Sequence, residues 1–348
     1  LDNDSPNNSM DYIKAWAEGK LDIWVKPDNL LRNLSYPPVD KPIPYVYYNR
    51  KEAEKGGNLE LEEKLKTKIP DGITTKYPLI FIQTGDNLGF AGGNNVGIKY
   101  ALAKKDSKYI WLLNNDTAIQ KDALSKMVEV IEKNEKIGIV GSKLLYYDKP
   151  DILQTLCGSY KMTWYNAGAG KYIQPFDKDS KKNDIIFEIE GYIVGASMLI
   201  RNDVFEDIGL FDENYFMYKE ESDLCLRAIR RGWKLFCAGK AKVYHKEGAS
   251  TGKYKTVKFM KKIRKRPTFF RFVMSGCLEV RNGIYFVKKH YGNFYAFLYT
   301  ISILPKKTLR MIAGILLLDD FKIKRLKLIL KAIKDGWLKN MGKPKELK

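Results

Sequence analysis

WLLNNDT, residues 111–117, is the stretch that decides the fold. Tyr109 to Leu113 form a continuous apolar run, which is typical of a parallel strand covered on both faces. The run ends at two amides and a carboxylate, and ligands of open α/β sheets bind beyond the carboxyl ends of strands. Asp116 is therefore a candidate ligand for Mg²⁺, which takes one or two carboxylates together with substrate phosphates. The alternative is that these polar residues form only a turn and a helix N-cap.

The charge of the chain is concentrated near its C-terminal end. Of the 348 residues, 45% are hydrophobic and 29% charged, as in a globular protein of one or two domains. The net charge of +20 resides in residues 251–348, whereas residues 1–250 are neutral. From Lys253 onward, basic residues alternate with apolar ones in a helical pattern, which predicts binding to an anionic membrane surface. Nucleic-acid binding is the competing interpretation, and the apolar runs disfavour it. No apolar run reaches the roughly 20 residues of a membrane-spanning helix.

The cysteines give no sign of a metal cluster. Cys157, Cys225, Cys237 and Cys277 lie far apart and include no C-x-x-C pair. This spacing argues against a zinc site or a disulfide framework and suits a reducing compartment. We therefore expect free thiols and a cytoplasmic protein.

The N-terminal segment contains two acids, Asp2 and Asp4, just before a short helix expected over 10–19. Carboxylates in such a loop can accept hydrogen bonds from ribose hydroxyls or a base N–H, and a surface turn with a helix cap is the alternative. The chain begins without an initiator methionine or a preceding strand, so we expect that a first strand is missing. Repeated prolines in residues 22–78 indicate an insertion.

Residues 86–97, DNLGFAGGNNVG, follow a strand expected over 79–83 and lead into a helix expected over 94–103. Glycines allow the backbone to approach a ligand closely, and the free N–H groups of a helix N-terminus favour an anion or a polar base edge. The string matches neither the dinucleotide-binding nor the Walker phosphate-binding fingerprint.

Two later stretches carry further candidates. Residues 220–223 place three acids at a helix start, where they complement the helix dipole or provide a general base. His245 lies where a strand ends, as Asp116 does, which fits a metal ligand; a satisfied surface histidine is the alternative. Small residues at 195–197, inside a strand expected over 191–200, leave room for a substrate sugar or for a neighbouring helix.

These motifs occur together, and in the same order, in one enzyme family. Residues 87–95, 112–117, 195–199, 209–213, 220–227 and 243–245 resemble the glycosyltransferase family 2 enzymes, especially their rhamnosyltransferase-like branch. The resemblance runs from about residue 2 to residue 252 and is interrupted by the insertion at 22–78. It implies an α/β catalytic domain of the GT-A type over 1–252, with a mostly parallel central sheet and flanking helices. A basic helical region follows over 253–348.

The resemblance also implies roles for individual residues. Asp116 matches the last acid of the family's metal motif, and His245 matches its late metal-site histidine. Glu221 falls where the family usually has an aspartate base, so Glu220 and Asp223 are alternatives. The implied donor-binding residues are Asp2, Asp4, Asn87, Gly89, Gly92, Asn94, Asn95 and Asn115, and the implied sugar pocket contains Gly195, Ala196 and Ser197.

The implied activity is inverting transfer of rhamnose or another hexose from a dTDP- or UDP-sugar, with Mg²⁺ or Mn²⁺ as cofactor. The acceptor would be a hydroxyl of a glycan or of a polyprenyl-diphosphate-linked sugar in cell-surface polysaccharide synthesis. The basic region would hold the enzyme at the inner face of the cell membrane, and no nucleic-acid partner is expected. Two other functions remain open: a nucleic-acid-binding protein, and a non-catalytic homologue with a degenerate site.

Overall fold

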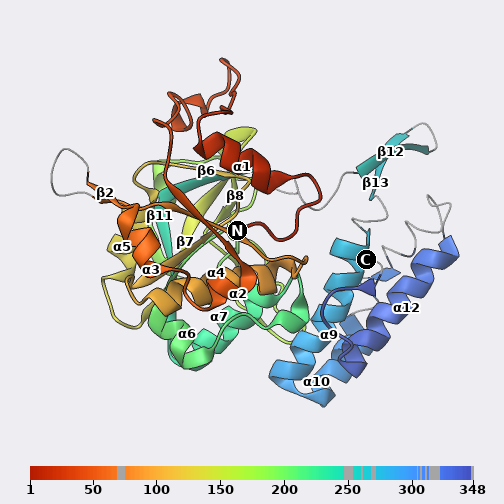
Figure 1. Cartoon of the computed structure of the whole chain (residues 1–348). Coiled ribbons are helices and arrows are strands. Elements are labelled where there is room, and N and C mark those ends of the chain that lie inside the picture. The colour runs from red at the N-terminus through yellow and green to blue at the C-terminus, as the bar shows by residue number, and fades with distance from the viewer. Residues whose placement is uncertain are drawn as a thin grey trace.

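A computed structural model describes residues 1–68, 75–246, 254–259, 262–267, 272–303, 322–345 and the positions 305, 308, 309 and 312. Figure 1 shows an α/β body with a group of C-terminal helices beside it. The strands are β1 Tyr45–Asn49, β2 Thr67–Lys68, β3 Thr75–Lys76, β4 Leu79–Gln83, β5 Tyr109–Leu113, β6 Thr117–Ile119, β7 Ile137–Tyr146, β8 Lys149–Leu156, β9 Ile186–Glu188, β10 Ser197–Arg201, β11 Lys234–His245, β12 Tyr254–Phe259 and β13 Lys262–Pro267. The α-helices are α1 Ser9–Ala17, α2 Arg50–Glu54, α3 Leu59–Lys64, α4 Gly89–Lys104, α5 Ala123–Ile131, α6 Asn202–Ile208, α7 Glu220–Arg230, α9 Leu278–Tyr291, α10 Asn293–Leu298 and α12 Lys322–Leu338.

The central sheet has the strand order β5-β10-β7-β11-β6, and β8 and β9 are attached to β7 and β11. β5, β7 and β11 run in the same direction, because β10 is antiparallel to both β5 and β7 whereas β11 is parallel to β7. The sheet is therefore mixed, which corrects the mostly parallel pairing expected from the sequence. β10 is antiparallel because it enters the sheet at the carboxyl end of β5, where Ser197 pairs with Leu113.

A second sheet pairs β1 with β4 in parallel, so the predicted insertion at 22–78 contributes a strand to the body. The N-terminal residues bond the same strand β4. The Asp2 N–H donates to the carbonyl of Ile82 (2.8 Å), and the Thr84 N–H donates to the carbonyl of Asp2 (3.0 Å). These backbone hydrogen bonds fix the N-terminal segment beside the start of α4.

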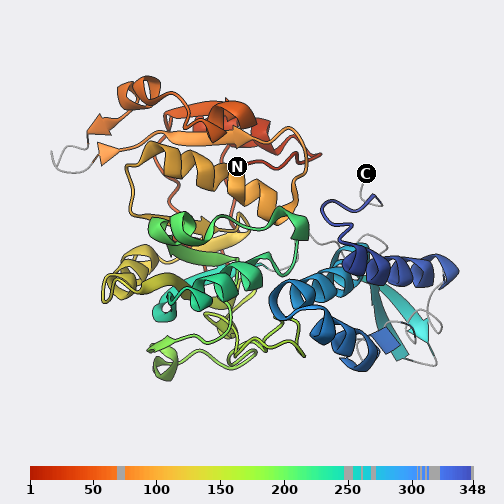
Figure 2. The same cartoon turned by 90° about the horizontal axis from the view of Figure 1, so that it is seen from below.

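One buried apolar cluster connects the sheet to the C-terminal helices. It includes Ile139 of β7, Leu224 of α7, Phe286 of α9 and Ile329 of α12. Seen from below in Figure 2, α9, α10 and α12 form a compact group against the body. Within the described part of the chain, no helix has the length and apolar character needed to cross a membrane. Part of the predicted basic region, including 260–261, 268–271 and 313–321, lies outside the described residues.

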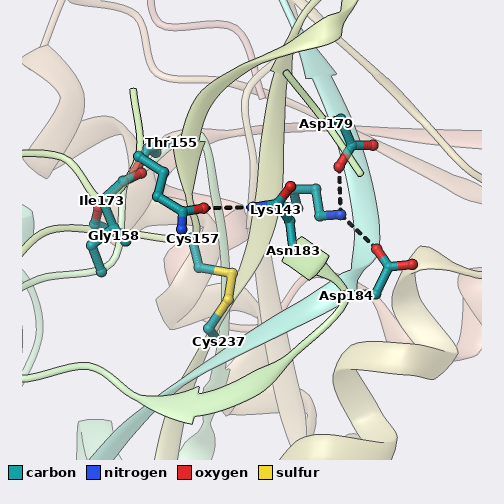
Figure 3. Close-up of a disulfide and its surroundings, with 10 residues drawn as sticks. Lys143, Thr155, Cys157, Gly158, Ile173, Asp179, Asn183, Asp184 and Cys237 are labelled. Atoms are coloured by element: carbon teal, nitrogen blue, oxygen red, sulfur yellow. Dashed lines mark hydrogen bonds and ion pairs between the residues drawn. A yellow bond between two sulfur atoms is a disulfide. The ribbon is translucent and has the colours of Figure 1, made fainter. Parts of the chain in front are cut away.

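Cys157, directly after β8, forms a disulfide with Cys237 of β11 (Figure 3). The expectation of four free thiols is therefore wrong for this pair, while Cys225 and Cys277 are buried and are not part of this disulfide. The two paired cysteines are 80 residues apart in the sequence, and only the pairing of β8 and β11 with β7 brings them together. Beside the disulfide, the buried Lys143 ammonium donates to two aspartates (Figure 3).

Candidate active site

Asp116 and His245 meet at one edge of the central sheet. Asp116 lies between β5 and β6, and His245 is the last residue of β11. β6 pairs antiparallel with β11, which sets Thr117 opposite His245. The Lys246 N–H also donates to the carbonyl of Asp116 (3.0 Å). As a result, the imidazole Nε2 lies 3.2 Å from Asp116 Oδ1, so the structure brings together the two residues predicted to share a metal ion.

Gln154 of β8 orients the His245 ring. Its Oε1 lies 3.0 Å from His245 Nδ1, and both side chains are buried. An amide oxygen only accepts hydrogen bonds, so this contact assigns the ring proton to Nδ1 and leaves the Nε2 lone pair facing Asp116. Two acceptor atoms at 3.2 Å are stable together when a proton or a cation lies between them. When a proton is also present on Nε2, the hydrogen bond from the imidazole and its positive charge lower the pKa of Asp116 despite the opposing effect of burial.

The chemistry of this pair fits a divalent cation. Carboxylates suit Mg²⁺ and Mn²⁺, and a histidine whose other ring nitrogen donates to a fixed acceptor is the usual form of a metal-ligating histidine. Among the described residues, no group of three or more His, Cys, Asp or Glu side chains is placed to hold a metal. An ion at Asp116 and His245 would therefore take its other ligands from water or substrate, as Mg²⁺ usually does.

A cavity of about 500 Å³ extends to Asp116. Its walls are β5 with residues 114–116, the first turns of α4, and Met217, and its volume falls in the range of about 300–1,000 Å³ that is usual for ligand sites. The predicted donor-binding residues that line it are Gly89, Asn94 and Asn115.

The glycine-rich string begins helix α4 at Gly89, instead of forming a loop ahead of a helix at Asn94 as expected. A side chain at Gly89, whose φ is +72°, would clash with the carbonyl oxygen of Phe216. A Cβ at Gly93 would lie 3.2 Å from the Asn3 side chain. A Cβ at Gly92 would meet the side chains of Leu88 and Glu213. The close approach that the glycines permit is thus to other parts of the protein, and these contacts shape the cavity wall.

Asn3 ties the N-terminal segment to α4. Its amide nitrogen donates to the carbonyl of Gly89 (2.9 Å), and its Oδ1 accepts from the Leu88 N–H (3.0 Å). Leu1 and Asn3 line the cavity, whereas the predicted nucleoside-binding acids Asp2 and Asp4 are not among its lining residues. Because Asp2 pairs with β4 as a strand residue, its side chain and that of Asn3 project to opposite sides.

Two other predicted donor-binding amides have partners within the protein. Asn95 is buried, donates to the carbonyl of Phe211 and to the Glu213 carboxylate (2.9 Å each), and accepts from the Phe211 N–H (3.1 Å). Asn87 Oδ1 accepts from the Gly89 N–H (3.0 Å). Both amides therefore hold the start of α4 in place.

The small residues at the start of β10 pack against the protein. A Cβ at Gly195 would lie 3.0 Å from the ring of Phe90, which belongs to α4. Ala196 and Ser197 are buried, and Ser197 Oγ accepts from the Trp111 indole (3.0 Å). Of the two explanations for their small size, a neighbouring helix is the one that the structure shows.

Glu220 and Glu221 are the first two residues of helix α7. Burial raises the pKa of both carboxyl groups, and one carboxyl oxygen of each has no hydrogen-bond partner among the described residues. Glu220 is only 3% exposed, whereas Glu221 is partly exposed. Neither lines the cavity, which ends at Met217 shortly before α7.

Asp223, the third candidate base, is fully buried and bound to the C-terminal helix α9. Its Oδ1 lies 2.8 Å from His290 Nε2 and 2.7 Å from Lys289 Nζ, and its Oδ2 lies 2.8 Å from Arg227 Nε. Burial favours the neutral acid, but the hydrogen bond from His290 and the charges of Lys289 and Arg227 hold the pKa of Asp223 well below its usual range. A carboxylate stabilised in this way is a weak proton acceptor.

Residues 61–209 match the family model of glycosyl transferase family 2. Residues 61–209 are therefore similar to glycosyl transferase family 2 domains, and the α/β body followed by C-terminal helices is the GT-A architecture that the motifs predicted.

Several relatives transfer hexoses or rhamnose according to their names. The chain is 29% identical over 156 residues to the low-salt glycan biosynthesis hexosyltransferase Agl10 of Haloferax volcanii, a match that covers 43% of this chain and 46% of that protein. It is 29% identical over 161 residues to rhamnosyltransferase WbbL of Escherichia coli (44% of this chain, 58% of the relative). It is 40% identical over 63 residues to N-acetylglucosaminyl-diphospho-decaprenol L-rhamnosyltransferase of Mycobacterium tuberculosis (18% and 20%). The chain thus spans about half the length, or less, of these relatives.

A solved structure of GalNAc-T7 with UDP, GalNAc and Mn²⁺ aligns with 76% of this chain and 44% of its own, at 14% identity and a TM-score of 0.44.

Proposed function

We propose that the protein is an inverting glycosyltransferase that moves rhamnose or another hexose from a dTDP- or UDP-sugar to a hydroxyl of a glycan or polyprenyl-diphosphate-linked acceptor. The match of residues 61–209 to the glycosyl transferase family 2 model supports sugar transfer, and two of the relatives above are rhamnosyltransferases by name. The observation that carries the proposal is the 3.2 Å approach of Asp116 and His245 beside the cavity.

The donor would lie in the cavity with its diphosphate toward Asp116. Asp116 and His245 are the residues that would hold Mg²⁺ or Mn²⁺, in an orientation that Gln154 sets. When bound, such an ion supplies positive charge to the oxygens of the departing diphosphate. Asn94 and Asn115 line the same cavity, as does Gly89 at the start of α4, where the helix dipole favours a negatively charged ligand.

A carboxylate of α7 would take the proton of the acceptor hydroxyl as that hydroxyl attacks the anomeric carbon from the face opposite the diphosphate. Glu221 fits this role best, because it is partly exposed and has a raised pKa and an oxygen without a hydrogen-bond partner among the described residues. Glu220 is the alternative and is more deeply buried. A general base contributes about 10²–10⁴-fold to the rate.

Helix α12 supports association with the anionic inner face of the cell membrane. Ile323, Leu330 and Leu338 are exposed on it. The exposed Lys327 and Lys334 fall on the same face at helical spacing. A face that mixes apolar side chains with lysines suits an anionic lipid surface. Binding there would place the enzyme at the surface where a lipid-linked acceptor resides.

Release of nucleoside diphosphate from a panel of UDP- and dTDP-sugars, with Mn²⁺ and a polyprenyl-diphosphate-linked acceptor, tests the proposal. The wild-type protein should turn over one donor of the panel, and Asp116→Ala should abolish that turnover. Asp177→Asn, at an exposed acid, is the matched control and should retain it. Equal turnover by Asp116→Ala and the wild type would rule out the metal role, and a wild-type protein that neither binds nor turns over any donor would be a non-catalytic homologue.

A further inference from the structure

Residues 216–219 join the cavity wall to the start of α7 in a strained conformation. Phe216, Tyr218 and Lys219 have φ values of 63°, 71° and 81°. Residues with a side chain rarely adopt this left-handed region, and such a backbone persists only where the surrounding contacts determine it.

Asn282 of α9 provides these contacts. Its amide nitrogen lies 3.0 Å from the carbonyl oxygen of Tyr215, 2.8 Å from that of Met217 and 2.7 Å from that of Tyr218. The side chain is fully buried. An amide carries two N–H groups, so the three carbonyls share them. One side chain of the C-terminal helices therefore bonds the strained segment at two points and the residue before it at a third.

Arg281 fixes the orientation of this amide. Its Nε donates to Asn282 Oδ1 (3.0 Å), and its Nη2 donates to the carbonyl of Tyr215 (3.1 Å). A guanidinium group only donates, so its contact identifies the oxygen of Asn282 and directs the NH₂ group toward the segment.

The segment touches both halves of the candidate active site. The Phe216 carbonyl accepts from the Ala91 N–H (3.3 Å) at the start of α4, where the absence of a side chain at Gly89 leaves room for it. Met217 lines the cavity, and the acids Glu220–Glu221 follow directly. A displacement of residues 216–219 would therefore shift the cavity wall and the acids relative to one another.

We propose that Asn282 is a positioning residue for sugar transfer, because its amide holds residues 216–219 and thereby sets the acid pair of α7 relative to the donor cavity. The inference rests on the proposed transfer function. It gives the C-terminal helices a part in the active site in addition to membrane association. A misplacement of about 1 Å in an active site costs on the order of 100-fold in rate.

Asn282→Leu tests the inference, because it removes the N–H groups and keeps most of the side-chain volume. Ile329→Ala is the matched control: Ile329 is buried in α12, which packs against α9. We expect kcat of Asn282→Leu to fall on the order of 100-fold. Ile329→Ala should change kcat by only a few-fold at a comparable loss of thermal stability.

Hydrogen exchange at residues 216–221 gives a second readout that needs no substrate. Exchange there should become faster in Asn282→Leu and stay unchanged in Ile329→Ala. A folded Asn282→Leu variant with unchanged exchange at 216–221, or with wild-type kcat, would overturn the inference. If Asn282→Leu does not fold, Asn282→Asp, which keeps the contact with Arg281, is judged by the same two criteria. A wild-type protein without transfer activity would contradict the proposed function, whereas the exchange result separately reports whether Asn282 holds the segment.

Discussion

His245 Nε2 lies 3.2 Å from Asp116 Oδ1, where β11 ends beside the segment that follows β5. The two atoms are both acceptors when the ring proton is on Nδ1, the nitrogen that faces Gln154. The arrangement therefore has a place for a cation between two side chains that come from different strands. The cavity described above adjoins the acid of this pair.

Gln154→Leu should weaken Mn²⁺ binding about 10–100-fold, as is typical when the partner of a metal-ligating histidine is removed. The substitution leaves Nδ1 of His245 without its acceptor, so the ring is free to change tautomer and orientation. Electron paramagnetic resonance titration of Mn²⁺ in the presence of UDP measures the effect. Gln154→Glu keeps an acceptor at the same position and should retain most of the affinity. Equal affinity in Gln154→Leu and the wild type would contradict the assigned role.

The acid limb of the pH–rate profile should have its midpoint above the ordinary glutamate pKa of 4.5, because burial raises the pKa of Glu221. A base acts in its deprotonated form, so kcat falls as the pH drops through this raised pKa. Glu221→Gln should lower kcat by about 10²–10⁴-fold and remove that limb of the profile. Glu220→Gln is the matched variant. If it lowers kcat more than Glu221→Gln does, and Glu221→Gln keeps the acid limb of the profile, Glu220 is the general base instead.

Asp223→Asn should destabilise the protein by about 3 kcal/mol at pH 7, since it leaves the partly buried Arg227 and Lys289 without their buried carboxylate. The folded-state pKa of Asp223 is depressed below 3.8. Its contribution is therefore fully present above the unfolded-state pKa and is lost as the pH falls below about 4. Urea unfolding at several pH values should show the difference between wild type and variant shrinking on acidification. Asp207→Asn, which removes a surface partner of Arg231, should change stability little. A difference that is independent of pH down to pH 3 would refute the linkage.

Reversing the charge of Lys327 and Lys334 should release the protein from anionic vesicles. A lysine near an anionic surface contributes about 1 kcal/mol, so the double Lys→Glu variant should bind at least about 25-fold more weakly. Flotation with phosphatidylserine-containing vesicles measures this. Reversal of the exposed Lys121 and Lys133 on the sheet body is the matched control. A similar loss in both double variants would show that binding follows net charge and not the α12 face.

The ends of the key strands could be predicted because local patterns encode them. The apolar run from Tyr109 stops at Leu113, where β5 ends, and the polar residues that follow form the metal-site candidate. The meeting of Asp116 with His245 depends on the pairing of β6 with β11, which is a long-range contact. The order of the family motifs implied that these two residues meet, whereas no local sequence pattern predicts the pairing of β6 with β11.

The supporting residues could not be predicted, because each acts through a partner far away in the sequence. Gln154 and Asn282 are ordinary polar residues until β8 and α9 are packed against the site. Asn95 belongs to a glycine-rich motif typical of donor binding, yet its amide bonds the loop around Phe211. The disulfide of Cys157 with Cys237 likewise depends on strand pairing that the spacing of cysteines does not reveal.

Titration calorimetry of UDP and dTDP with and without Mn²⁺ tests the central claim most directly, in the wild type, Asp116→Ala, His245→Ala and the control Asp177→Asn. We predict that one nucleotide binds the wild type and the control only when Mn²⁺ is present, and that both site variants lose this metal-dependent binding while remaining folded. Nucleotide binding of equal strength without the metal, or in Asp116→Ala and His245→Ala, would contradict a cation site at these two residues.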